Sequence, residues 1–96
     1  MNYAKGLKRA RERAHLSQRK LATKAGLDAS YIAMLEGGKR KPSTEAIEKL
    51  ADALGMPSSL LLLLCAEKAD LRGIQAGRVK ELFELLVAAL REGDRE

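Results

Sequence analysis

The sequence predicts an all-α protein, and three observations support this fold class. Leu, Ala, Lys, Arg and Glu are abundant in the 96 residues, whereas the chain holds only two prolines and three aromatic residues. Apolar residues recur at three- and four-residue spacing along most of the chain. Signals for the start and the end of helices fall between these periodic segments. We therefore predict five short helices over residues 1–66 and an amphipathic helix within residues 67–96.

The first helix is predicted over residues 3–14, because apolar side chains there share one face while lysines and arginines lie outside it. His15 and Leu16 form the turn that follows. A lone histidine at the end of a helix is typical of a capping residue or a bystander, and no other His or Cys lies near it, so we expect no metal site. The expected apolar stripe consists of Tyr3, Leu7, Ala10 and Ala14.

The second and third helices are predicted over residues 18–25 and 29–36, with Ser17 and Asp28 as their N-caps. Gly26 lies where a tight turn between them needs a positive φ, and the glycine pair at 37–38 ends the third helix. Two short crossed helices of this kind have the shape that places one helix in the major groove of DNA. The residues that they would bury between them are Leu21, Ala22, Ile32 and Leu35.

The fourth helix is predicted from Ser43 or Thr44 to Leu54, and Gly55 ends it. The fifth begins at residues 57–59 and continues through a run of five leucines, which cover more than one face of a helix. One set can close the domain core, namely Leu60, Leu61 and Leu64. The other set, Leu62 and Leu63, then needs a partner, either the last helix or a second subunit.

A sixth helix is predicted from about Gln75 to Arg91, and its apolar stripe is broader than a surface helix needs. It either packs on the fifth helix of the same chain or forms the seam of a homodimer. So small a chain has little interior in which to bury this stripe, and this favours the dimer. The expected dimer interface consists of Leu62, Leu63, Val79, Leu82, Phe83 and Leu86.

Positive charge is concentrated in the first part of the chain. Residues 1–41 hold eleven Lys or Arg against three acids, a net charge of +8, whereas residues 59–96 hold six against seven, a net charge of −1. This asymmetry predicts a basic N-terminal face for a polyanion and a C-terminal part for protein contacts. If only the charge is considered, basic helices that are merely solvated explain it equally well. The helix-turn-helix spacing favours nucleic acid.

Several classes of protein do not fit the sequence. Cys65 is the only cysteine and cannot form an intrachain disulfide, so we expect a reducing cytoplasm and a small buried apolar residue. The leucine run is too short to span a membrane, and no secretory signal precedes the first basic residues. We find no catalytic set, phosphate-binding glycine loop or metal-ligand cluster, so we expect no enzyme activity, no cofactor and no metal.

A set of short motifs connects these observations. In chain order they are Arg11, Ser17-Gln18, Leu21-Ala22, Gly26, Tyr31-Ile32, Glu36-Gly37-Gly38-Lys39, Pro42 and Ala51-Asp52-Ala53-Leu54-Gly55. With these motifs the chain resembles the Cro/repressor-type (XRE-family) helix-turn-helix DNA-binding proteins, over about residues 3–64. The resemblance implies a lambda-repressor-like, five-helix DNA-binding domain over residues 1–66. Residues 67–96 would then be an element for dimerisation or for binding a partner protein.

The resemblance also implies roles for single residues. Gln18 matches a residue that touches a backbone phosphate and braces the third helix, with Arg19 beside it. Arg11 and Glu36 match an internal ion pair with a structural role. The basic loop of Lys39, Arg40 and Lys41 matches positions that lie over the phosphates.

The third helix would present the surface that contacts the bases. Its outward positions are Asp28, Ala29, Ser30, Tyr31, Ala33 and Met34. None is Arg, Asn or Gln, the strong readers of guanine and adenine, so thymine-rich half-sites and DNA shape would carry the specificity, or specificity is low. Tyr31 is expected to reach a phosphate, and Asp28 to cap the helix.

Three functions follow from this interpretation. The leading hypothesis is a homodimeric transcriptional repressor that binds a two-fold operator in double-stranded DNA. A second is an antitoxin or a restriction–modification controller whose C-terminal helix binds a partner protein. A third is an interaction protein that has lost DNA binding, which Gln18 and the basic loop argue against.

Overall fold

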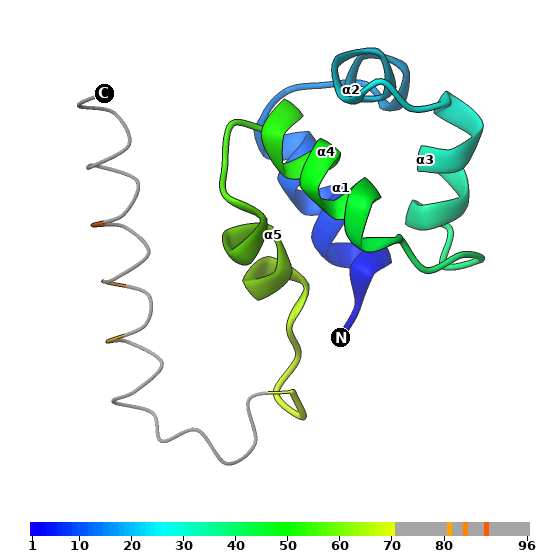
Figure 1. The fold of residues 1–96 in the computed structure, drawn as a ribbon. Helices are drawn as coiled ribbons and strands as arrows, with labels where there is room; N and C mark the ends of the chain where they lie inside the picture. The colour runs from blue at the N-terminus through cyan, green and yellow to red at the C-terminus, as the bar shows by residue number, and fades with distance from the viewer. Residues whose placement is uncertain (71–80, 82–83, 85–87, 89–96) are drawn as a thin grey trace.

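The computed structural model describes residues 1–70 and, beyond them, residues 81, 84 and 88. Its first seventy residues form five helices and no strand, as predicted, and the bounds agree with the expected ones to within about a residue (Figure 1). The helix predicted over residues 75–91 lies almost wholly outside the described residues. The helices are α1 (Tyr3–Arg13), α2 (Gln18–Ala25), α3 (Ala29–Glu36), α4 (Thr44–Ala53) and α5 (Ser58–Cys65).

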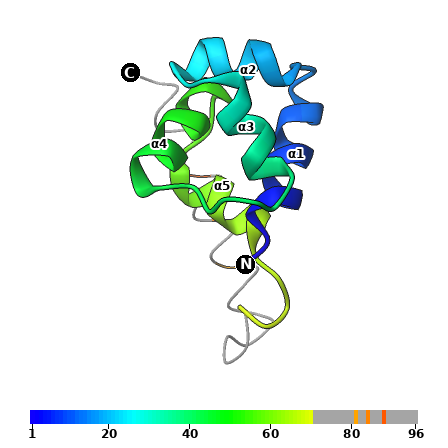
Figure 2. The ribbon, with the colours of Figure 1, turned by 90° about the vertical axis from the view of Figure 1, so that its right-hand side faces the viewer.

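A single hydrophobic core joins the five helices. α1 packs against α3 and α5, and α4 packs against α2 and α5. α2 and α3 also pack against each other. Figures 1 and 2 show α2 at one end of the domain and α5 toward the other. The largest fully buried side chains are Leu21, Ile32, Leu35, Leu50 and Leu61.

Three of the helices begin with a side chain that accepts a hydrogen bond from the backbone of the first turn. Ser17 accepts from the Lys20 amide at 3.0 Å, and Ser43 accepts from the Ala46 amide at 3.1 Å. Asn2 does the same for α1, a cap that the sequence analysis did not identify. Asp28 occupies the N-cap position of α3, but its side chain makes no capping hydrogen bond, so that part of its predicted role is wrong.

α1, α2, α3 and α4 end in the same pair of backbone hydrogen bonds, which close around a residue with positive φ. After α3, the amide of Gly38 donates to the Leu35 carbonyl and the amide of Lys39 donates to the Met34 carbonyl. This is the Schellman motif, which satisfies the last carbonyls of a helix. After α1 the left-handed position falls on His15, with a φ of 58°, whereas the other three helices use glycine.

α1 and α5 cross with their backbones in close contact at Gly6. A Cβ atom added there would lie 2.7 Å from the Cα of Cys65 and would also overlap its Sγ. The amide of Asn2 donates to the Cys65 carbonyl at 2.7 Å, so the end of α5 is bonded to the start of α1. Cys65 is buried, as predicted, and burial raises the pKa of its thiol.

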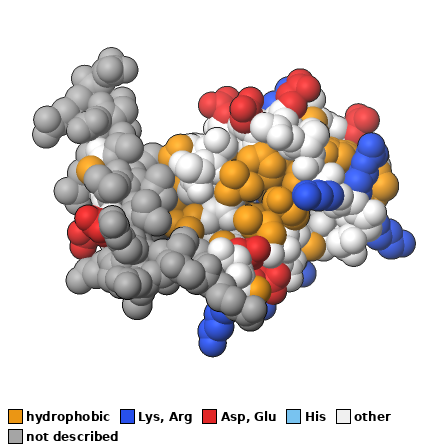
Figure 3. Space-filling view, turned by 60° about the horizontal axis from the view of Figure 1, so that its bottom comes forward, with side chains coloured by type: hydrophobic (Ala, Val, Ile, Leu, Met, Phe, Trp, Pro, Cys, Tyr) orange, Lys and Arg blue, Asp and Glu red, His pale blue; other side chains and the backbone are white. Residues whose placement is uncertain are grey.

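The leucine run buries different residues from those expected. Leu61 is fully buried, as expected, but Leu64 is 42% exposed, so its predicted place in the core is wrong. Leu62 is half-buried and packs against the core, while Leu60 and Leu63 are half-buried. Hydrophobic side chains gather on the face of the domain shown in Figure 3. No helix in the described part of the chain is both long and apolar enough to span a membrane.

Candidate nucleic-acid interface

α3 has one buried and one exposed face, and the exposed face is the predicted reading surface. Ile32 and Leu35 are fully buried against the other helices. The side chains on the opposite face are small or flexible and carry little hydrogen-bonding capacity. The residues exposed on or beside α3 are Asp28, Ala29, Ser30, Ala33 and Met34. The fold therefore presents this helix to a partner but supplies only Ser30 and Asp28 as side-chain hydrogen-bonding groups.

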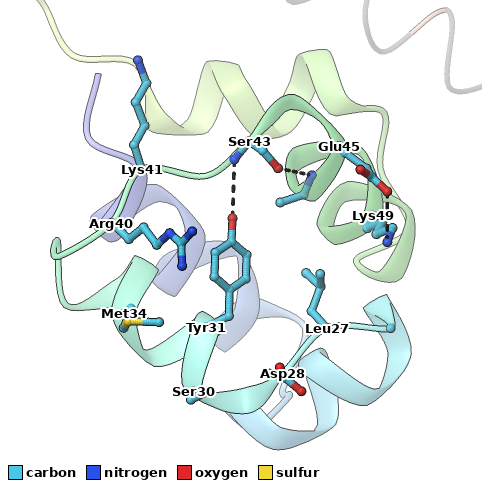
Figure 4. Close-up of a pocket in the computed structure, with 12 residues that line it drawn as sticks. Leu27, Asp28, Ser30, Tyr31, Met34, Arg40, Lys41, Ser43, Glu45 and Lys49 are labelled. Atoms are coloured by element: carbon cyan, nitrogen blue, oxygen red, sulfur yellow. Dashed lines mark hydrogen bonds and ion pairs between the residues drawn. The ribbon is translucent and has the colours of Figure 1, made fainter.

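Tyr31 lies apart from this exposed face. It is half-buried, packs against the core, and its hydroxyl accepts a hydrogen bond from the backbone amide of Ser43 at 3.4 Å. It lines an open cleft of about 570 Å³ between α3, the basic loop and the start of α4, together with Ser30, Met34 and Arg40 (Figure 4). In this structure the Tyr31 hydroxyl is thus already bonded within the protein, whereas the sequence analysis expected it to reach a phosphate.

The structure brings Arg11, Glu36 and Gln18 together from three different helices. Arg11 Nε donates to Glu36 Oε2 at 2.7 Å and Nη2 donates to Oε1 at 2.9 Å, a bidentate pair. Arg11 Nη1 also donates to the Leu16 carbonyl at 2.8 Å. Gln18 Nε2 donates to Glu36 Oε1 at 3.2 Å, so the side chain at the first residue of α2 is held against the last residue of α3.

The electrostatics of this cluster follow from its burial. The side chain of Glu36 is 4% exposed and that of Arg11 is 13% exposed, so each charge depends on the other in place of water. The hydrogen bonds from the Arg11 guanidinium to Glu36 raise the pKa of Arg11 further above its ordinary value, against the opposing effect of desolvation. Glu36 lies at the C-terminal end of α3, where the helix dipole disfavours a negative charge, and Arg11 offsets this.

The basic loop follows α3 directly. Lys39, Arg40 and Lys41 are all exposed. The Schellman motif fixes the start of this loop, and Ser43, the N-cap of α4, fixes its end. Arg19 is exposed one residue after Gln18 in the first turn of α2. The residues predicted to contact DNA therefore lie on α2, on α3 with its N-cap Asp28, and on the loop that follows α3.

Sequence reasoning missed the contacts that connect these residues. It did not identify the bond from Tyr31 to the Ser43 amide, nor the donation from Arg11 to the Leu16 carbonyl. The sequence does hold one indication of the bond from Arg11 to the Leu16 carbonyl. An arginine that pairs with a buried carboxylate has further N–H donors, which need other acceptors.

Comparison with known proteins is consistent with this geometry. The family model described as helix-turn-helix matches residues 7–61, a span that begins in α1 and ends in α5. The chain belongs to the helix-turn-helix family. The resemblance inferred from the motifs and the all-helical fold class are thereby confirmed.

Relatives of this helix-turn-helix protein include regulators from bacteria and a phage. An HTH-type transcriptional regulator of Mycobacterium tuberculosis is 39% identical over 51 residues, which are 53% of this chain and 36% of that protein. The chain thus spans about a third of that relative. The immunity repressor protein of Bacillus phage phi105 is 29% identical over 98 residues, covering 98% of this chain and 68% of the repressor.

A solved structure shares the fold. It is the restriction-modification controller protein C.AhdI from Aeromonas hydrophila, with a TM-score of 0.60 and 38% sequence identity. The match covers 62% of this chain and 91% of the controller protein.

Proposed function

We propose that this protein is a transcriptional regulator that binds double-stranded DNA with α3 in the major groove and acts as a repressor. One observation carries the proposal: the exposed face of α3 is flanked on its C-terminal side by a loop of three exposed cations. Helix α3 would read the groove while the loop and the start of α2 contact phosphates. Regulators and a repressor among its relatives support this role. The cytoplasm is the expected compartment, because the partner is DNA.

The residues that would contact DNA fall into two groups. The base-facing group consists of Asp28, Ala29, Ser30, Ala33 and Met34, and the half-buried Tyr31 lies beside it at the edge of the exposed face. The phosphate-facing group consists of Gln18, Arg19, Lys39, Arg40 and Lys41. Because Gln18 donates to Glu36 through one N–H, its amide keeps a second N–H for a phosphate while its position stays fixed.

We expect the active form to be a homodimer. A single small module buries about 600–1,000 Å² on DNA, which is usually too little for high specificity. On α5, Leu64 is 42% exposed and Leu63 is half-buried, so this helix offers apolar surface for a second subunit. Of the expected interface residues, Leu62 and Leu63 lie on α5. The other four, Val79, Leu82, Phe83 and Leu86, lie outside the described residues. Light scattering over a dilution series would test this, and a mass equal to one chain at all concentrations would contradict it.

An acidic residue on α3 provides the test of DNA binding. We expect Ala33→Glu to abolish binding to duplexes from the protein's own upstream region, because a carboxylate on the exposed face repels phosphates. Ala69→Glu adds the same charge at an exposed position after α5 and should leave binding unchanged. Equal loss in both variants, or no binding by the wild-type protein at low salt, would overturn the proposal.

A controller of a restriction–modification operon is the second candidate, favoured by the likeness to C.AhdI over most of that chain. Such a protein would bind DNA in the same way but regulate a neighbouring nuclease gene. An antitoxin would instead bind a toxin through residues 67–96. Co-expression with the adjacent gene product separates these roles: a stable complex supports the antitoxin, and its absence together with operator binding upstream of a nuclease gene supports the controller.

A further inference from the structure

Both tyrosines of the chain lie under cations of the same loop. Arg40 Cζ is 5.4 Å from the centre of the Tyr31 ring, and Lys41 Nζ is 5.8 Å from the centre of the Tyr3 ring. These distances are those of cation–π contacts. Figure 4 shows the Arg40 side chain turned toward Tyr31 and the Lys41 side chain pointing away from it. Two successive cations are therefore held on rings from two different helices, α3 and α1.

The two rings are fixed much more firmly than the loop residues above them. Tyr31 packs against the core, and its hydroxyl accepts the hydrogen bond from the Ser43 amide. Tyr3 also packs against the core, and it lines a small apolar cavity with Leu7 and Pro42. Both rings are half-buried, whereas Arg40 and Lys41 are exposed.

Within the described part of the chain, no carboxylate lies within 4 Å of the Arg40 or the Lys41 side chain. Three adjacent cations repel one another, and long side chains lose conformational freedom when they are held in one place. The faces of the rings attract the cations. This attraction offsets part of the repulsion among the cations and part of the conformational entropy lost when their side chains are held, before any DNA is present.

We propose that Tyr31 and Tyr3 are positioning residues that hold Arg40 and Lys41 ready for DNA phosphates, and that neither ring reads a base. The inference rests on the proposed DNA-binding function and assigns to the two tyrosines a role in affinity. Lys39 has no ring partner among the described residues, and it therefore serves as the internal control.

A double-mutant cycle measured by DNA binding tests the role of Tyr31. The probe is a duplex of arbitrary sequence at low salt, because phosphate contacts do not depend on sequence. We expect Tyr31→Leu to weaken binding about two- to fivefold and Tyr31→Phe, which keeps the ring, to stay near the wild-type protein. In the Arg40→Gln background, Tyr31→Leu should cause no further loss. In the Lys39→Gln background, the two losses should multiply.

The same cycle applies to Tyr3→Leu and Lys41→Gln. A second measurement, on the free protein, follows the ring-current shift of the Arg40 side-chain protons by NMR. This shift should remain in Tyr31→Phe and disappear in Tyr31→Leu. The backbone amide spectrum of both variants should remain that of a folded protein.

The outcomes separate the inference from the proposed function. If the wild-type protein binds DNA and Ala33→Glu does not, but the losses from Tyr31→Leu and Arg40→Gln multiply, DNA binding stands and the positioning role is overturned. Tyr31→Leu that binds as tightly as the wild-type protein also overturns it. A wild-type protein that binds no duplex overturns both.

Discussion

The guanidinium of Arg11 bonds both carboxylate oxygens of Glu36 and thereby joins α1 to the end of α3. The same carboxylate accepts from Gln18, so the end of α3 is also joined to the start of α2. One buried ion pair therefore sets the position of two elements that the proposed function brings to DNA. Its contribution is geometric as much as energetic, because buried pairs recover little more than their desolvation cost.

Removal of one partner of this pair should be more harmful than removal of both. We expect Arg11→Met to destabilise the protein by on the order of 3 kcal/mol, because it leaves the Glu36 carboxylate buried without a counter-charge. The double variant Arg11→Met/Glu36→Leu should recover most of this loss. Chemical denaturation of the wild-type, single and double variants measures the effect. A double variant less stable than Arg11→Met would contradict the prediction.

Glycine at position 15 should stabilise the protein. His15 has a φ of 58°, a conformation that costs a residue with a Cβ roughly 1–2 kcal/mol and costs glycine very little. We expect His15→Gly to raise the free energy of unfolding by about 1 kcal/mol, which corresponds to a rise in Tm of about 4–8 °C. His15→Ala keeps the Cβ and is the matched control, with a Tm near that of the wild-type protein. A fall in Tm for His15→Gly would show that the side chain stabilises the turn.

Much of the fold could be predicted because its signals are local. Ser17 and Ser43 cap helices within the next three residues, and Gly26 and Gly38 end helices through backbone conformation alone. The prediction failed where the local sequence held no such signal or where successive residues were all alike. His15 takes a glycine's conformation without being glycine, and the leucine run has no polar residue to mark its outer face, so the pattern predicts a buried Leu64 that the structure exposes.

Apart from the cluster of Arg11, Gln18 and Glu36, the candidate site could be predicted as a set of residues but not as a set of contacts. The basic loop could be predicted because its three cations are adjacent in the sequence. Their rings lie nine and thirty-eight residues away in the chain, for Arg40 and Lys41 respectively, and no periodic pattern connects such pairs. Contacts of this kind are set by how α1 and α3 pack, which only the folded structure determines.

Alanine at position 6 should destabilise the protein although it favours helix formation by up to about 1 kcal/mol. The added Cβ would overlap Cys65, including its Cα at 2.7 Å, and backbone atoms cannot rotate away. We expect Gly6→Ala to lower the free energy of unfolding by about 1–3 kcal/mol. Gly6→Ala/Cys65→Ala removes the overlap with Sγ only and should recover part of the loss. An increase in Tm for Gly6→Ala would mean that α1 and α5 lie further apart.

The Cys65 thiol should be protected from alkylation in the native protein. It is 2% exposed, and burial raises its pKa, so the reactive thiolate is scarce at neutral pH. We expect iodoacetamide to label Cys65 at a rate that follows the opening of the domain, and Gly6→Ala to accelerate labelling. Labelling of the unfolded chain in denaturant gives the reference rate. Equal rates in buffer and in denaturant would contradict the burial of this residue.

The basic loop should determine how steeply DNA binding depends on salt. Each lysine or arginine that neutralises a phosphate contributes about 0.9 to the magnitude of the slope of log K against log salt concentration. We expect Lys39→Gln and Arg40→Gln each to reduce that magnitude by nearly one, for specific and non-specific duplexes alike. Lys68→Gln, an equal change of charge at an exposed position after α5, should leave the slope unchanged. Equal shifts of the slope in all three variants would contradict the prediction. They would mean that the loop acts through general electrostatic attraction and makes no defined phosphate contacts.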